Sequence, residues 1–218
     1  QDAFAIESLT RAKKAVEDGT FAPEVDPIAV KTRKDETLVE GDEQPFNANI
    51  DKIPQLKPAF RKGGTVTPAN SSSISDGAAA LVLMKRSEAE KRGLVTIAVL
   101  HAHSTHSQEP NWFTTAPIGS IKKVLDKVGW SKDEIDLFEI NEAFAVVAMA
   151  AMRDLDIPHD KINVHGGACA LGHPVGASGS RIIVTLLNAL EKYDLRKGVA
   201  SLCIGGGEAT AVAVERVN

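Results

Sequence analysis

The chain has 218 residues, of which 43% are apolar and 5% aromatic, and its 25 Lys and Arg against 29 Asp and Glu leave a net charge of −4. These values describe a globular chain with one large domain or two small ones, and they exclude a basic nucleic-acid groove, which needs clustered Lys and Arg. The longest apolar run, residues 143–152, is too short to cross a bilayer, so we expect neither nucleic acid nor a membrane as a partner.

The N-terminal third divides into two segments of different character. Residues 1–18 carry apolar side chains at helical spacing and are followed by Gly19, a pattern that predicts a helix with a glycine stop. Between Pro23 and Pro68 prolines recur among charged and polar residues, which predicts an irregular region with one short strand at Ile28–Thr32.

A short strand and a short helix are predicted next. Ala78–Met84 is a continuous run of apolar residues, as in a strand buried on both faces. Ser87 and Glu90 stand three residues apart, the spacing of a capping box, and predict that a helix begins here.

From Leu94 onward the sequence alternates regularly between strand and helix patterns. The predicted elements are a strand at Leu94–Ala102, a helix from Pro117, a strand at Asp136–Ile140, a helix at Asn141–Leu155, a strand at Lys161–His165, a helix at Ser178–Tyr193 and strands at Val199–Ile204 and Ala209–Val217. This β-α-β-α-β-α-β-β order predicts an α/β fold, with a mostly parallel sheet covered by helices on both faces.

Three polar residues fall where strands of such a sheet end. Asn141, His173 and Cys203 each follow or close a predicted strand and are separated by about one strand–helix repeat. Ligands collect at the carboxyl ends of parallel strands, so we expect these side chains to converge on one site.

Each of these residues also has a structural interpretation. The glycine-rich segment 166–179 either holds a ligand closely or forms a tight turn against the sheet, and His173 within it is either structural or suited to acid–base work. Cys203 is either a small buried residue or a thiol beside the free N–H groups of the glycines at 205–207. Asn141 also fits a helix N-cap, and Cys169 looks structural.

A zinc site is the main metal alternative. His165, Cys169 and His173 are spaced four residues apart, and Cys203 offers a fourth ligand. That spacing needs a helix, which Gly166, Gly167, Gly172 and Pro174 disfavour, so no metal site is predicted.

Three motifs in this region resemble the C-terminal signatures of the thiolase family. They are Asn-Glu-Ala-Phe-Ala at 141–145, Gly-Gly-x4-Gly-His-Pro-x-Gly-x-Ser-Gly-x-Arg at 166–181 and Cys-x-Gly-Gly-Gly at 203–207. Residues 70–80 are similar to the segment in which thiolases leave their coenzyme A-binding loop region. The resemblance thus spans nearly the whole chain.

The resemblance implies a thiolase-like α/β fold, with a mixed, mostly parallel sheet between helices, preceded by an irregular loop domain. Residues 1–74 would be the remainder of the coenzyme A-binding loop domain, 75–93 the last strand and helix of the N-terminal domain, and 94–218 the C-terminal domain. Thiolases are about twice this long, and their nucleophilic cysteine lies in the N-terminal half. Neither Cys169 nor Cys203 matches it, so the implied partner is an N-terminal thiolase half.

Catalytic roles follow from the same resemblance. His173 would activate the nucleophilic cysteine and, with a water held by Asn141, line one oxyanion hole. Cys203 would be the second catalytic cysteine, an acid/base for the other substrate. The N–H of Gly205 would complete a second oxyanion hole. Preorganised donors of this kind stabilise the charge that thioester chemistry places on oxygen.

Substrate contacts are implied as well. Ser72 would lie beside the pantetheine arm of coenzyme A, and Ala143 and Phe144 would wall the acyl pocket. Coenzyme A thioesters would be substrates, with no permanently bound cofactor and no metal.

The implied reaction is acyl transfer that interconverts two acetyl-CoA with acetoacetyl-CoA and CoA, as part of fatty acid metabolism. Residues 164–168 and the triple glycine are more similar to short-chain than to long-chain thiolases. The alternatives are a 3-ketoacyl-CoA thiolase of β-oxidation and a non-catalytic coenzyme A-binding or interaction module. A homodimer or homotetramer is implied. Two cysteines make no disulfide framework, and a cytoplasmic location is the default, with mitochondria as the alternative.

Overall fold

The computed structural model describes residues 1–33 and 35–217, so Asn218, the last residue of the expected C-terminal domain, lies outside the described residues. The elements are α1 (Asp2–Glu17), β1 (Ile28–Lys31), β2 (Glu36–Val39), α2 (Gln44–Asn47), the 3₁₀ helices η1 (Ile50–Gln55) and η2 (Pro68–Asn70), α3 (Arg86–Lys91), β3 (Ala98–Ser107), η3 (Pro110–Thr115), α4 (Ala116–Val128), η4 (Lys132–Glu134), β4 (Leu137–Ile140), α5 (Ala145–Leu155), η5 (His159–Lys161), α6 (Ala168–Leu171), α7 (Ser178–Lys192), β5 (Lys197–Ile204) and β6 (Glu208–Arg216).

The main sheet is mixed, in the strand order β3-β6-β5-β4. Only β4 and β5 run parallel, whereas β5 with β6 and β6 with β3 are antiparallel. The prediction of a mostly parallel sheet is therefore wrong. The turn at 205–207 folds β6 directly back along β5, and a parallel neighbour would have required a crossover of a dozen or more residues.

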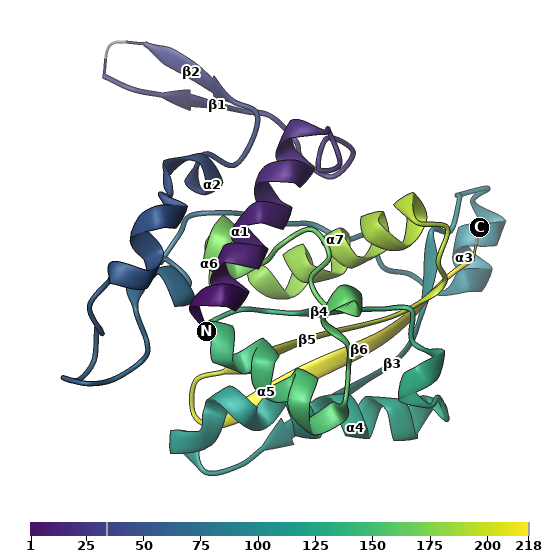
Figure 1. Cartoon of the computed structure of the whole chain (residues 1–218). Coiled ribbons are helices and arrows are strands. Elements are labelled where there is room, and N and C mark those ends of the chain that lie inside the picture. Colours follow the sequence, from purple (N-terminus) through teal and green to yellow (C-terminus); the bar gives the residue numbers. More distant parts are fainter. Residues whose placement is uncertain (34, 218) are drawn as a thin grey trace.

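Helices cover both faces of this sheet, as predicted from the alternation. Figure 1 shows α4 and α5 on one side and α7 on the other. Ile121 and Val124 of α4 pack with Phe138 of β4 in one core cluster, and Leu186 of α7 packs with Leu137 in a second. Because it lies between two helical layers, β4 is buried along its whole length. Each fully buried aliphatic side chain of this kind contributes about 1.5–3 kcal/mol.

The strand predicted at Lys161–His165 does not form. A 3₁₀ helix occupies His159–Lys161, and only one parallel bridge, from Ile162 to Phe138, follows it. Asn163 adopts φ 47° and uses its side-chain amide in place of a strand partner. Its Oδ1 accepts from Ile140 N at 2.8 Å and its Nδ2 donates to Ile140 O at 2.8 Å, so the side chain satisfies the edge of β4.

The strand predicted at Ala78–Met84 is also absent from the described structure. These residues have no strand pairing, and Val82 and Leu83 are 86% and 72% exposed. No strand of the described residues lies beside them, so the apolar pattern has no sheet to join. The following helix begins at Arg86 with Lys85 as N-cap, so Ser87 does not cap it as predicted.

The N-terminal third is a helix followed by irregular chain, as predicted. Leu9 and Ala12 of α1 pack against Ile53 and against Ala170 of α6. A hairpin of β1 and β2 projects from the body, with Ile28 paired to Val39 and every strand residue exposed (Figure 1). The second of these strands was not predicted.

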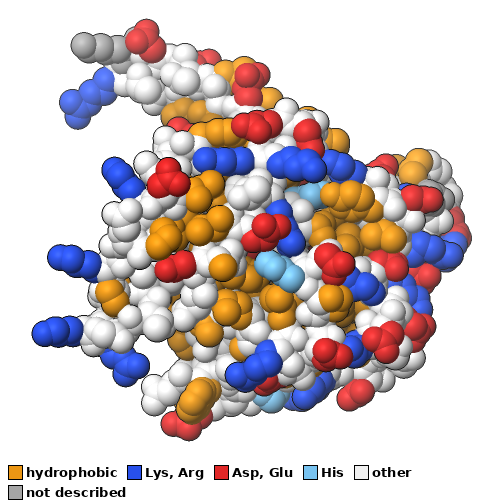
Figure 2. Space-filling model, in the orientation of Figure 1, with side chains coloured by type: hydrophobic (Ala, Val, Ile, Leu, Met, Phe, Trp, Pro, Cys, Tyr) orange, Lys and Arg blue, Asp and Glu red, His pale blue; other side chains and the backbone are white. Residues whose placement is uncertain are grey.

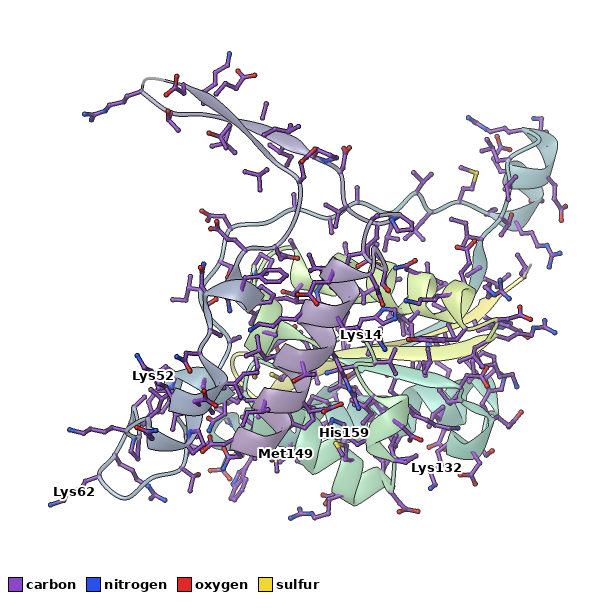
Figure 3. The ribbon with its side chains drawn as sticks, turned by 45° about the horizontal axis from the view of Figure 1, so that its top comes forward. Lys14, Lys52, Lys62, Lys132, Met149 and His159 are labelled. Atoms are coloured by element: carbon purple, nitrogen blue, oxygen red, sulfur yellow. The ribbon has the colours of Figure 1, made fainter. Side chains whose placement is uncertain are left out.

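Charged side chains are distributed over the surface. Figure 2 shows Lys and Arg interspersed with Asp and Glu on one face, with apolar patches between them. Figure 3 shows Lys52 of η1 and Lys62 of the loop that follows it on the side away from Lys132. Among the described residues, no helix is long and apolar enough to span a membrane.

Candidate active site

Asn141 and Cys203 lie at the same edge of the sheet. The parallel pairing of β4 with β5 ends at Ile140 and Ser201, and Asn141 N continues it by donating to Ser201 O at 2.9 Å. Cys203 stands two residues beyond Ser201 on the neighbouring strand. This is the arrangement of strand ends that the sequence predicts.

The glycine-rich loop brings His173 to Asn141. His173 N donates to Ser73 O at 3.0 Å, which anchors the loop to the N-terminal third. The side chains of Asn141 and His173 meet with Nδ2 and Nε2 3.3 Å apart. The interpretation of Asn141 as a helix N-cap is wrong, because α5 begins at Ala145 with Phe144 as its N-cap.

The other ring nitrogen of His173 contacts a serine. Nδ1 lies 2.6 Å from Ser178 Oγ, and that hydroxyl donates its proton to Pro174 O at 3.0 Å. A hydroxyl has one proton, so Ser178 Oγ accepts from the Nδ1–H of His173. His173 is therefore the tautomer with a lone pair on Nε2, the form that accepts a proton from a substrate or nucleophile.

Burial lowers the pKa of His173, and the nearby Arg181 guanidinium lowers it further. Both effects disfavour the imidazolium, so the ring is neutral around physiological pH. A neutral, oriented imidazole with one unprotonated nitrogen is a general base.

Two charged residues flank this pair, and no role was predicted for either, although Arg181 closes the second motif. Arg181 donates from Nη1 to Glu139 Oε1 at 3.2 Å and from Nη2 to Asn141 Oδ1 at 3.4 Å. Glu139 is only 2% exposed, and burial raises its pKa, whereas the Arg181 guanidinium opposes that shift and favours the carboxylate. The sequence signal for this contact was a single charge within the otherwise apolar β4.

Cys203 is a buried thiol at the end of β5. It is 7% exposed and belongs to the core cluster on the α4 and α5 side of the sheet. Burial raises its pKa to about 11, so the thiol is protonated at neutral pH. A protonated thiol can donate a proton, and its thiolate is a strong base.

The turn after Cys203 depends on glycine. Gly207 has φ 91°, and a Cβ at this position would lie 2.2 Å from Gln108 O. Gln108 N donates to Gly207 O at 2.9 Å, which ties the turn to the end of β3. Gly205 is exposed, and a Cβ there would have no neighbour within 4 Å, so space remains in front of it.

The residues expected to contact substrate form one side of the site. Ser72 N and Ser72 Oγ both donate to Ala143 O, at 3.1 and 3.0 Å. The Phe144 ring packs edge-on against Phe60 and Phe113, with centroids 6.1 and 6.4 Å apart. Ala143 and Phe144 also pack against the core cluster to which Cys203 belongs.

A buried carboxylate supports the loop from behind. Glu142 is fully buried and accepts from Ser8 Oγ at 2.7 Å, Asn163 Nδ2 at 2.8 Å and Cys169 N at 3.1 Å. Gly167 passes so close that a Cβ would lie 2.4 Å from the carboxyl carbon. This network joins α1 to the loop. Burial raises the pKa of Glu142, and the hydrogen-bond donors around it oppose that shift.

The proposed zinc ligands do not form a cluster. Among the described residues, no group of three or more His, Cys, Asp or Glu side chains is placed to hold a metal ion. His165 packs against the Phe21 and Tyr193 rings, with centroids 6.0 and 5.6 Å away. The Cys169 thiol contacts Glu142 O at 3.7 Å, and burial together with Glu142 raises its pKa, in keeping with a structural role.

Two protein-family models match the chain. The thiolase C-terminal domain matches residues 94–216, and the thiolase N-terminal domain matches residues 1–87.

Named relatives and solved structures match over the whole chain. The cytosolic acetyl-CoA acetyltransferase of Mus musculus is 48% identical, over 99% of this chain and 55% of that protein. The crystal structure of the Bacillus anthracis acetyl-CoA acetyltransferase matches with a TM-score of 0.97 and 42% identity, over 100% of this chain and 55% of that one. The Acat5 thiolase from Ascaris suum, crystallised with coenzyme A, matches with a TM-score of 0.89 and 38% identity, over 99% and 55%. The chain spans about half the length of the curated relatives it matches.

Proposed function

The chain belongs to the thiolase family, and on that premise we propose that it is the C-terminal part of an acetyl-CoA C-acetyltransferase. The reaction is the interconversion of two acetyl-CoA with acetoacetyl-CoA and CoA. The observation that carries the proposal is the neutral His173, held by Ser178 and Asn141 with its Nε2 lone pair at the end of β4. The N-terminal thiolase half supplies the nucleophilic cysteine.

The first half-reaction uses His173. Its Nε2 accepts the proton of the nucleophilic cysteine thiol, and the thiolate attacks the carbonyl carbon of acetyl-CoA. The bond from that carbon to the CoA sulfur breaks, and the CoA thiolate takes up the proton that Nε2 accepted, which returns His173 to its neutral form. His173 and a water held by Asn141 stabilise the oxyanion, which in such reactions is among the largest contributions to rate.

The second half-reaction uses Cys203. Its thiol first loses its proton to solvent, and the thiolate removes a proton from the methyl group of a second acetyl-CoA. The resulting carbanion attacks the acetyl group on the nucleophilic cysteine. The carbon–sulfur bond to that cysteine breaks, which releases acetoacetyl-CoA, and the departing cysteine thiolate takes up a proton from solvent. In thiolysis Cys203 instead deprotonates the incoming CoA thiol. The N–H of Gly205 donates to the oxyanion of this step.

Coenzyme A binds along the wall beside these groups. Ser72 lies next to the pantetheine arm, and Ala143 and Phe144 bound the acyl pocket. The apolar cluster of Phe60, Phe113 and Phe144 supports this placement, because a short acyl chain gains by leaving water. The Ascaris suum thiolase crystallised with coenzyme A supports the ligand class.

The proposal extends to organisation and location. Residues 1–74 belong to the coenzyme A-binding loop domain, 75–93 end the N-terminal domain, and 94–218 form the C-terminal domain. The complete protein is a homodimer or homotetramer. Its location is the cytoplasm, which the cytosolic mouse relative supports.

The test uses the natural polypeptide that carries these residues. It is incubated with acetyl-CoA and its intact mass is measured under denaturing conditions; we expect an acetyl adduct that excess CoA removes. Thiolysis is then compared between acetoacetyl-CoA and longer 3-ketoacyl-CoA substrates. Faster cleavage of the longer substrates would assign the protein to β-oxidation instead. Tight binding of CoA with no adduct and no thiolysis would overturn the proposal in favour of a binding module.

A further inference from the structure

A buried ion pair lies next to Asn141, the residue that contacts His173. Glu139 is on β4, and Arg181 is in the first turn of α7. Their side chains are 3% and 19% exposed, with Nη1 3.2 Å from Oε1. A charge at such a position is costly unless its partners are well placed, which makes the geometry of this pair informative.

The second arm of the Arg181 fork reaches the site itself. Nη2 lies 3.4 Å from Asn141 Oδ1. Glu139 and Asn141 are two residues apart along an extended chain and so face the same side, which lets one planar guanidinium contact both. A lysine, with a single point of charge, has no such fork.

The donor-only chemistry of arginine then orients the amide. A guanidinium has no acceptor, so the Asn141 atom that faces it is the oxygen. The Nδ2 group consequently points to His173, 3.3 Å away, where only an unprotonated Nε2 can receive it. On the opposite side of the ring, Ser178 requires a proton on Nδ1. Two separate sets of contacts thus select the same tautomer.

We propose that Arg181 and Glu139 are positioning residues, which orient the Asn141 amide and thereby hold His173 with Nε2 unprotonated. The catalytic part of this inference rests on the function proposed above. Glu139 keeps the guanidinium in place, and Arg181 acts on His173 through Asn141 without contacting substrate. The other carboxyl groups around Arg181 are those of Glu24, Asp42 and Glu142.

The first experiment reads the tautomer without activity. The natural polypeptide is labelled with ¹⁵N-histidine, and long-range ¹H–¹⁵N spectra are recorded for His173 in wild type, Arg181→Met, Arg181→Lys and Glu139→Gln. Wild type should show a protonated Nδ1 and an unprotonated Nε2. In Arg181→Met we expect the Nε2-protonated form to become detectable, because the amide is free to flip. Arg181→Lys should fall between them.

The second experiment measures acetoacetyl-CoA thiolysis by the same variants. We expect kcat to fall about ten- to a hundredfold in Arg181→Met with KM nearly unchanged, because the defect is one of orientation. Arg181→Lys should recover only part of the loss. Arg216→Met is the matched control: Arg216 is also mostly buried and paired with Asp194, but it lies at the far end of β6 from the glycine turn.

The outcomes separate the two proposals. An unchanged His173 tautomer together with unchanged kcat in folded Arg181→Met would overturn the positioning role. If Arg181→Met does not fold, the same result in Arg181→Lys and Glu139→Gln overturns it. A wild-type protein with the stated tautomer but no acyl transfer would refute the proposed function and leave the positioning of His173 intact.

Discussion

At the scale of single residues, the chemistry proposed for Cys203 follows from the place of its thiol. The side chain is buried in the core cluster on the α4 and α5 side of the sheet, and burial raises its pKa to about 11. In Cys203→Ser, a far less acidic hydroxyl takes its place. We expect the acetyl adduct to form still, since His173 is intact, whereas acetoacetyl-CoA formation falls by about a hundredfold or more. Intact mass and steady-state rates measure the two steps.

Cys169→Ser is the matched control for that variant. Cys169 is partly buried and contacts the backbone oxygen of Glu142 rather than the site. Both steps should stay close to wild type. A loss of adduct in Cys203→Ser, or equal losses in both variants, would contradict a role confined to the second half-reaction.

His165 gives a prediction about acid stability. Neither of its ring nitrogens has a hydrogen-bond partner among the described residues, and burial lowers its pKa to about 4, aided by Lys192 and opposed by Asp18. The unfolded chain therefore binds a proton first as the pH falls below about 6.5. Stability should be lost between about pH 6.5 and 4, by on the order of 2–3 kcal/mol.

His165→Phe should remove this loss while keeping the contacts to Phe21 and Tyr193. Urea unfolding between pH 7 and 4 measures the free energy of unfolding in both proteins. Wild type should lose more stability over this window than the variant. Parallel curves would show that His165 does not titrate in the unfolding reaction.

Site residues differ in how well the sequence reveals them. Asn141 and His173 could be paired in advance, because each was expected to follow a strand of one sheet; the structure brings them together even though the strand before His173 does not form. The contact of Arg181 with Glu139 could not, because it joins a helix to a strand 42 residues away and depends on their packing. Glu142 was quoted as part of a motif, yet its burial against Ser8 of α1 became visible only in the structure.

At the scale of elements, Asn163 explains why one predicted strand is missing. Its amide occupies both the N–H and the C=O of Ile140 and also donates to Glu142. The spacing of apolar residues around Asn163 predicts a strand. It does not reveal that the Asn163 side chain makes the hydrogen bonds that a neighbouring strand would make. The helices α4, α5 and α7 were predicted well because their apolar faces repeat over several turns, whereas strand direction depended on how β6 folds back.

Asn163→Ala should destabilise the fold. It leaves the N–H and C=O of Ile140 without their partner in a buried place, and each such group costs about 1–3 kcal/mol. We expect the free energy of unfolding to fall by roughly 2–5 kcal/mol. Asn188→Ala is a control with the same chemical change: this amide donates to Thr20 O and to the Glu24 carboxylate, and it contacts no strand backbone among the described residues. A difference of less than 1 kcal/mol between the two would refute the substitute-strand role of Asn163.

At the scale of the whole molecule, the structure departs most clearly from the sequence prediction at residues 78–84, an apolar run that was expected to be a buried strand. It has no strand pairing and runs from the Ser72 region toward α3 (Figure 1), with Val82 and Leu83 exposed. The sequence describes a strand buried on both sides, and no described strand lies next to it. We therefore predict that this segment forms a strand only in a polypeptide that also contains an N-terminal thiolase half; the matched relatives are nearly twice as long as this chain.

Hydrogen exchange tests this dependence directly. We expect amides 79–84 to exchange slowly in a polypeptide that also contains an N-terminal thiolase half, because strand pairing protects backbone N–H groups. In the 218-residue chain alone they should exchange within seconds, whereas amides of β5, paired on both sides, stay protected in both. Residues 28–31 of β1 serve as an internal comparison, because this exposed strand is paired on one side only, with β2. Equally fast exchange of 79–84 in both polypeptides would show that the apolar run is not a strand, and that its exposed side chains need another partner.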